Sequence, residues 1–163
     1  MYVILGATGN TGSVAAEALL AKGQKVRVVG RSKERLSKLV ARGAEAFEAD
    51  LTDSAALTKV FTGARAIYVM LPPDPANPHY RQHQDEVTNS IATALEAAGV
   101  THAVVLSSFG ADKAGKTGPV LGLHILEERL ARIPPIYTRA TFPLYSARVR
   151  LPKLWYCGSD TQV

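Results

Sequence analysis

The sequence predicts an α/β fold in which a doubly wound parallel sheet lies between two helical layers, a three-layer αβα arrangement. Three observations predict it. The 163 residues suit a single domain. Short apolar segments alternate with helical segments of about ten residues, a pattern typical of right-handed βαβ crossovers. A glycine-rich turn, GATGNTG, separates the first apolar segment from the first helical one.

Six strands are expected where short apolar runs, several of them rich in Val, are bounded by polar or turn residues. These strands cover residues 2–5, 25–30, 44–49, 66–71, 102–108 and 136–141. Helices are expected between them. Ser32 and Asp53 can cap the start of two helices, and Gly23, Gly43 and Gly99 can end three. The expected helices cover residues 13–23, 32–43, 53–61, 79–98 and 119–131.

In such a sheet, a ligand binds beyond the carboxyl ends of the strands, where the strand order reverses. The loops that start near residues 6, 30, 50, 71 and 107 form this edge. They are therefore the expected location of the functional residues.

The glycine turn is predicted to bind a pyrophosphate. Glycine tolerates the backbone angles of a tight turn, and a helix that begins near Gly12 presents free N–H groups and a positive dipole end. Gly9 allows a phosphate to approach, and Gly12 allows the helix and strand to pack closely. A plain strand–helix turn with packing glycines is the alternative. The position of the glycine motif in the first βαβ unit favours phosphate binding. The proposed contacts are Gly6, Thr8, Gly9, Asn10, Thr11 and Gly12.

The end of the second strand predicts which dinucleotide is preferred. An acidic residue there favours NAD(H), whereas Arg accommodates the 2′-phosphate of NADP(H). Arg31 occupies this position, and Lys33 and Arg35 follow it. We therefore expect NADP(H) to be preferred over NAD(H). A solvated, basic helix start is the alternative interpretation.

Composition excludes several other classes of function. Lys and Arg total 19 against 14 Asp and Glu, which suits an anionic ligand, but no dense basic run predicts nucleic-acid binding. No apolar run approaches the ~20 residues that span a membrane. Cys157 is the only cysteine, so a reducing cytoplasm is expected. His79 and His83 lie four residues apart with Asp85 nearby, but the histidines lack a supporting constellation of cysteines or carboxylates, and no metal site is expected.

Further motifs follow the later strands: GRS after the second, ADLTD after the third, VMLPP after the fourth and LSSFGAD after the fifth. Together with GATGNTG, in this order, they resemble the NmrA-like branch of the atypical short-chain dehydrogenase/reductases. That branch includes NAD(P)H:quinone-reductase-like enzymes and NADP-sensing regulators. The resemblance extends from Met1 to about Arg132 and implies a Rossmann-type NAD(P)-binding domain.

The resemblance also implies roles for residues at the other strand ends. Asp50 and Leu51 would line the adenine pocket, although Asp50 is equally interpreted as a loop carboxylate or helix cap. Leu71 and Pro72 would run along the nicotinamide side. Ser107 ends the fifth strand, where related enzymes keep an active-site serine; a hydroxyl that satisfies local backbone is the alternative.

One departure concerns the catalytic pair of the superfamily, a tyrosine with a lysine four residues later. None of the six tyrosines has a lysine at that spacing. The position equivalent to the lysine falls near His124. The resemblance implies that His124 holds the nicotinamide ribose or transfers a proton. A packed or capped helix histidine is the alternative.

A second departure is at the C-terminus. Residues 1–142 are expected to form the NAD(P)-binding domain, and residues 143–163 an atypical tail. The tail lacks the Glu-Asn pair that the family has after the position of Phe142. The resemblance implies that this sequence lacks most of the family's C-terminal substrate lobe. A truncated or frame-shifted gene explains this departure, as does a short natural variant.

The expected function is hydride transfer from NADPH to a small electrophile such as a quinone, with Ser107 and His124 as candidate catalytic residues. A non-catalytic NADP(H) redox sensor that regulates a protein partner is one alternative. An inactive fragment is another. The expected partner is a small-molecule substrate or a protein, not a nucleic acid or a membrane, and a homodimer is compatible with the sequence.

Overall fold

The structure is a computed structural model of the chain. It describes residues 1–74, 76–115, 117–133 and 137–142, the last of these only as backbone. The expected tail, residues 143–163, lies outside the described residues. So does the expected domain boundary after residue 142.

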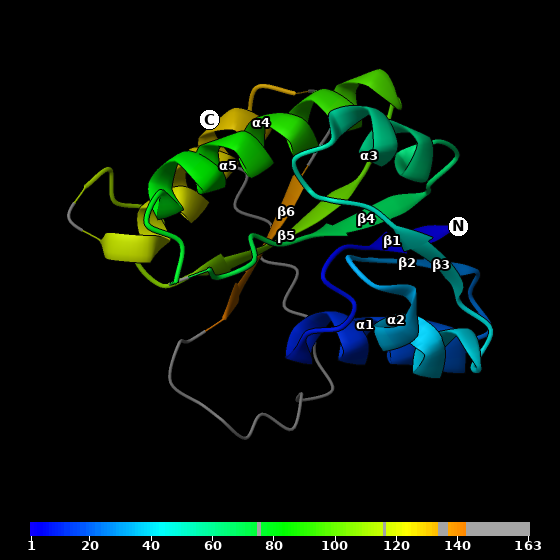
Figure 1. Cartoon of the computed structure of the whole chain (residues 1–163). Helices are drawn as coiled ribbons and strands as arrows, with labels where there is room; N and C mark the ends of the chain where they lie inside the picture. Colours follow the sequence, from blue (N-terminus) through cyan, green and yellow to red (C-terminus); the bar gives the residue numbers. More distant parts are fainter. Residues whose placement is uncertain (75, 116, 134–136, 143–163) are drawn as a thin grey trace.

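The described strands form one parallel sheet in the order β3-β2-β1-β4-β5-β6. β1 is the central strand: its Val3 pairs with Arg27 on one side and with Ile67 on the other. The chain therefore builds one half of the sheet, returns across β1, and builds the other half (Figure 1). The strands are β1 Tyr2–Ile4, β2 Val26–Gly30, β3 Glu45–Glu48, β4 Ala66–Val69, β5 Ala103–Ser108 and β6 Tyr137–Phe142.

Helices cover both faces of the sheet, as the sequence predicts. α1 and α2 lie on one face, and α3, α4 and α5 lie on the other (Figure 1). A short 3-10 turn, η1, leads directly into α5. The helices are α1 Asn10–Ala21, α2 Lys33–Val40, α3 Ser54–Phe61, α4 Tyr80–Ala97, η1 Gly118–Val120 and α5 Leu121–Leu130.

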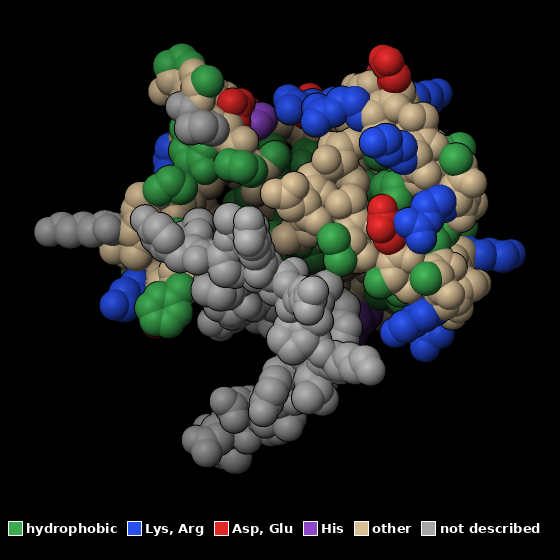
Figure 2. All heavy atoms as spheres, turned by 90° about the horizontal axis from the view of Figure 1, so that it is seen from below, with side chains coloured by type: hydrophobic (Ala, Val, Ile, Leu, Met, Phe, Trp, Pro, Cys, Tyr) green, Lys and Arg blue, Asp and Glu red, His purple; other side chains and the backbone are tan. Residues whose placement is uncertain are grey.

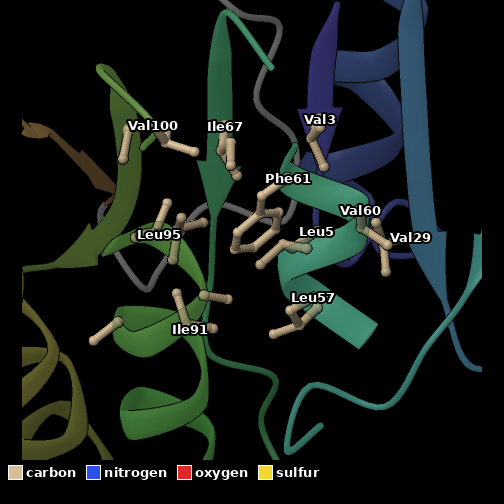
Figure 3. Packing of buried hydrophobic residues seen from close by; sticks show 14 of the residues in the cluster. Val3, Leu5, Val29, Leu57, Val60, Phe61, Ile67, Ile91, Leu95 and Val100 are labelled. Atoms are coloured by element: carbon tan, nitrogen blue, oxygen red, sulfur yellow. The ribbon is translucent and has the colours of Figure 1, made fainter. Parts of the chain in front are cut away.

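Each face of the sheet has its own apolar core. The larger core lies under α3, α4 and α5, where Phe61 is fully buried with Leu5 beside its ring (Figure 3). The smaller core packs Ala16 of α1 and Leu36 of α2 against β1 and β2. Two buried layers explain why the central strands consist almost entirely of apolar residues.

The predicted elements are confirmed, and their ends move by a few residues. The side chain of Asp53 caps α3 by accepting from the amide of Ala56 at 2.9 Å, and that of Ser32 caps α2 at 3.5 Å. The helix expected over residues 119–131 divides into η1 and α5. Among the described residues, no helix is both long and apolar enough to cross a membrane.

Candidate nucleotide-binding site

The strand order creates a gap between two neighbouring loops. After β1 the chain turns toward β2 on one side, and after β4 it continues toward β5 on the other. The loops that follow β1 and β4 therefore diverge above the sheet. A ligand in a doubly wound fold occupies this opening. The glycine turn, residues 6–12, follows β1 at this point.

Backbone conformation or packing within the protein explains two glycines of the turn, Gly6 and Gly12. Gly6 has φ +61°, and a Cβ there would lie 2.7 Å from the sulfur of Met70. A Cβ on Gly12 would lie 2.4 Å from the carbonyl oxygen of Gly6. Gly12 therefore permits the close packing of α1 on the turn that the sequence predicts.

Gly9 is different, because its backbone angles, φ −89° and ψ 171°, suit any residue. A Cβ there would have one close neighbour, the carbonyl oxygen of Gly6 at 3.3 Å. Gly9 is exposed, as are Thr8 and Asn10 beside it. Packing within the protein therefore does not explain why residue 9 is a glycine. The space in front of it is open to a ligand.

Helix α1 begins earlier than the sequence suggested. Its first residue is Asn10, not residue 13, and Gly9 is its N-cap. Gly12 therefore lies within the first turn instead of opening the helix. A glycine cap has no side chain to bond the free amides of the first turn, unlike Ser32 and Asp53 at α2 and α3. The first-turn amides of α1 therefore have no side-chain cap, and such a helix N-terminus can accept an anion.

Thr11 was expected to donate a hydrogen bond toward the phosphate. In the structure its hydroxyl already accepts one from the phenol of Tyr68, at 3.0 Å. Burial raises the pKa of Tyr68. Sequence reasoning missed Tyr68, because it lies 57 residues away and only the pairing of β4 with β1 brings it near.

Basic side chains surround the end of β2. Arg31 follows its last residue directly, and Lys33 begins α2; both are exposed. Within the described part of the chain, neither makes an ion pair. Lys and Arg side chains gather over the half of the molecule that carries α1 and α2 (Figure 2). The arrangement leaves Arg31 available to an anionic group.

Asp50 lies at the end of β3, and its carboxylate accepts two hydrogen bonds from Thr52. The backbone amide donates at 2.9 Å and the hydroxyl at 2.8 Å. These bonds hold the pKa of the Asp50 carboxyl below its usual value. Burial acts in the opposite direction, and the nearby His83 and Arg31 side chains lower the pKa a little further. The interpretation of Asp50 as a loop carboxylate thus has direct support. Leu51 beside it packs partly against the larger core.

Two further predicted residues follow β4. Leu71 is buried in the larger core, and Pro72 is half-buried. Leu71 is therefore fixed by packing, so Pro72 is the more accessible of the two.

Ser107 is buried, with 2% of its surface exposed, and its hydroxyl donates to the carboxylate of Glu127 on α5. Sequence reasoning missed Glu127, because the two adjacent acids in LGLHILEERL gave no sign that one of them is buried. The neighbouring Ser108 hydroxyl is buried without a hydrogen-bond partner among the described residues. The end of β5 thus holds one bonded serine and one unbonded serine.

Both ring nitrogens of His124, on α5, lie near an oxygen atom of the protein. Nδ1 lies 2.7 Å from the carbonyl oxygen of Ala111, and Nε2 lies 3.5 Å from the carboxylate of Glu128. The side chain is 15% exposed. This geometry favours the interpretation of His124 as a packed and hydrogen-bonded helix histidine.

The two remaining histidines of interest lie at the start of α4. His79 is its N-cap, and His83 is half-buried in the second turn. In the parts of the chain that the structure describes, no three histidine, cysteine or acidic residues are grouped as metal ligands.

A hollow of about 390 Å³ lies elsewhere, between the start of α3 and the middle of α4. All of its lining residues have polar side chains, and none of the predicted site residues is among them. The lining residues are Thr52, Ser54, Glu86, Asn89, Ser90 and Thr93.

Comparison with known proteins identifies the family. Residues 6–131 match the sequence profile of the NAD(P)H-binding family. The oxidoreductase ordB of Dothistroma septosporum is 34% identical over 74 residues, which cover 42% of this chain and 28% of that protein. The aligned region therefore covers less than a third of the ordB protein.

Solved structures share the fold. The triphenylmethane reductase of a Citrobacter species superposes with a TM-score of 0.71 at 23% identity. The NADPH-dependent quinone oxidoreductase QOR2 of Escherichia coli, solved with NADPH, also has a TM-score of 0.71, at 25% identity. Each match covers 85% of this chain and 47% of the other. The chain therefore spans about half the length of these proteins.

Proposed function

The chain belongs to the NAD(P)H-binding family, and from that premise we propose that it binds NADP(H) at the glycine turn for hydride transfer to a small electrophile such as a quinone. The bound nucleotide supplies the hydride, and the protein supplies position and electrostatics. Reductases of quinones and of triphenylmethane dyes share its fold, which supports this class of reaction.

One observation carries the proposal. Helix α1 starts from a glycine that cannot cap it, although the backbone of Gly9 would accept any residue. A serine or aspartate there would satisfy the free amides of the helix. A side chain would also occupy the place where an anion can meet those amides. A pyrophosphate explains both the missing cap and the glycine.

The exposed cations beyond β2 suit the 2′-phosphate of NADP(H). Arg31 offers a forked, charge-assisted contact, and Lys33 adds a second charge. Asp50 and Leu51 would border the adenine. Because Thr52 already engages one carboxylate oxygen of Asp50, its other oxygen would serve the nucleotide.

The nicotinamide half would extend past Leu71 and Pro72 toward Ser107 and His124. For His124 to contact the ribose, its ring must first leave the carbonyl of Ala111. Ser107 would act only with its proton shared with a buried carboxylate. These two residues remain the candidate catalytic groups.

The state of the candidate catalytic residues favours a second function, a non-catalytic NADP(H) sensor. Ser107 and His124 both have partners within the protein, and the Tyr-Lys pair is absent from the sequence. Such a sensor needs unequal affinity for NADPH and NADP⁺, because a ligand that binds two states equally cannot shift them. A protein partner would then replace the small substrate.

We further propose that residues 1–142 form the binding domain and residues 143–163 a separate segment. The single cysteine supports a reducing, cytoplasmic location. A homodimer is compatible with this arrangement.

The test is a calorimetric titration with NADPH and then NADH. Arg31→Asp should weaken NADPH binding by about tenfold or more, because a hydrogen bond to a charged group contributes about 1.5–3 kcal/mol. NADH affinity should change far less. Lys25→Asp makes the same charge change just before β2, at the opposite edge of the sheet, and should preserve the preference.

A quinone-reduction assay on the same sample separates the two functions. Turnover of NADPH supports the reductase. Saturable binding without turnover, with different affinities for NADPH and NADP⁺, supports the sensor. A folded chain that binds neither nucleotide contradicts both.

A further inference from the structure

Tyr68 connects the central strands to the first turn of helix α1. It lies on β4, and its neighbours Ile67 and Val69 point into the core on the other face of the sheet. Its own ring packs against the smaller core, under α1 and α2. From there the phenol reaches Thr11, the second residue of α1, and donates a hydrogen bond of 3.0 Å.

β4 contacts the glycine turn at two other places. The amide of Leu5 donates to the carbonyl oxygen of Tyr68 at 3.1 Å, where β1 leads into the turn. Met70, the residue directly after β4, packs against Gly6, where an added Cβ would lie 2.7 Å from its sulfur. The backbone of β4 and the Met70 side chain that follows it therefore support the beginning of the turn. Tyr68 is the side chain through which β4 reaches the end of the turn.

The hydroxyl of Thr11 can accept one hydrogen bond and donate another at the same time. Because Tyr68 is the donor in their contact, the proton of Thr11 stays free for an acceptor outside the protein. A hydroxyl that accepts a hydrogen bond becomes a stronger donor, since bonds in a chain polarise one another. Tyr68 thus both fixes the rotamer of Thr11 and strengthens it as a donor.

We propose that Tyr68 is a positioning residue for the cofactor: through Thr11 it orders the first turn of α1 around the pyrophosphate. This inference rests on the proposed function. Tyr68 itself need not touch the nucleotide. Tyr68 should affect binding of the pyrophosphate, which NADPH and NADH share. Arg31 should instead affect binding of the 2′-phosphate, which only NADPH carries.

The test is a double-mutant cycle with Tyr68→Phe and Thr11→Val, which keep the ring and the branched shape. Dissociation constants are measured by calorimetry for NADPH and NADH. Tyr68→Phe should weaken both nucleotides equally, by about three- to tenfold, the range for one neutral hydrogen bond. In the Thr11→Val background, Tyr68→Phe should have no further effect. Tyr2→Phe on β1 is the matched control and should leave both affinities unchanged.

Each outcome decides the matter. Unchanged affinity in Tyr68→Phe, while the wild type binds, overturns this inference and leaves the proposed function standing. An equally large loss in the Thr11→Val background also overturns it, because Tyr68 would then act by another route. A loss for NADPH alone does so too, since it would place the effect at the 2′-phosphate. A folded wild-type chain that binds neither nucleotide overturns both proposals.

Discussion

The three glycines of the turn differ in what requires them. Gly6 is favoured by its positive φ, and Gly12 is required by the carbonyl oxygen of Gly6. The sequence predicts the packing role of Gly12 correctly. It does not predict where α1 begins, because Gly9 lacks the capping side chain that marks a helix start.

Side-chain partners at the site were also beyond prediction. Glu127 approaches Ser107, and Ala111 approaches His124, only because α5 packs beside β5 and the loop after it. Spacing along the chain contains no sign of either contact. The functional roles of Ser107 and His124 therefore stay predictions, now with named partners.

At the residue scale, Asp50 predicts a pH dependence. Its pKa is lowered in the folded protein, so its hydrogen bonds with Thr52 stabilise the fold when the pH is above the unfolded pKa, about 4. That stabilisation is lost as the pH falls through the lower, folded pKa. Asp50→Asn should therefore be less stable than the wild type at pH 7, and the difference should shrink at acidic pH. Urea unfolding at pH 7 and at several acidic values measures this.

Asp112→Asn, at an exposed position in the loop after β5, is the control. A stability difference for Asp50→Asn that stays constant from neutral to acidic pH would contradict the assignment, because the lost interaction would then not depend on ionisation.

At the scale of elements, the alternation of apolar and helical segments was sufficient to predict every described strand and α-helix. The residues at which helices begin and end were harder to predict. Gly118 has φ +57° and Pro119 follows it, so the chain makes a 3-10 turn before α5 where the sequence suggested one helix. The close approach of Gly122 on α5 to Gln84 on α4 had no sequence signal, because the two residues lie far apart along the chain.

That close approach gives a prediction. A Cβ on Gly122 would lie 2.4 Å from the amide of Gln84. This amide is buried and bonded to the hydroxyl of Tyr80 and the carbonyl of Pro119, both at 3.1 Å. Gly122→Ala should displace it and lower the free energy of unfolding by about 1–2 kcal/mol. Urea denaturation measures the loss.

Removing the Gln84 side chain should reduce the loss of unfolding free energy caused by Gly122→Ala. In a Gln84→Ala background, Gly122→Ala should cost much less, because the position then has room. Gly115→Ala is the control, since a Cβ there meets nothing within 4 Å. Equal penalties in both backgrounds would contradict the proposed clash.

At the scale of the whole molecule, the parallel, three-layer fold was predictable because right-handed crossovers leave few arrangements for alternating elements. The binding edge was predictable for the same reason. The polar hollow between α3 and α4 was not, since its six lining residues come from a loop, a helix start and one face of a long helix. None of them forms a recognisable motif.

A cofactor that binds only the folded state should stabilise the entire domain. At 100 times the dissociation constant, NADPH would add about 2.7 kcal/mol, which corresponds to a rise in Tm of about 5–10 °C. A thermal melt with and without NADPH measures this rise. Gly9→Val should melt near the wild-type temperature without cofactor and gain nothing from it. A wild-type Tm that NADPH leaves unchanged at saturating concentration would contradict the proposal.

The central place of β1 has a consequence for synthesis of the chain. β1, β2 and β3 leave the ribosome first and can pair with one another, but the second edge of β1 has no neighbour until residues 66–69 emerge. Until then the glycine turn has neither Met70 beneath it nor Tyr68 to hold it. A nascent chain should therefore carry an exposed strand edge, a target for chaperones. Its affinity for the nucleotide should develop only after β4 has joined the sheet.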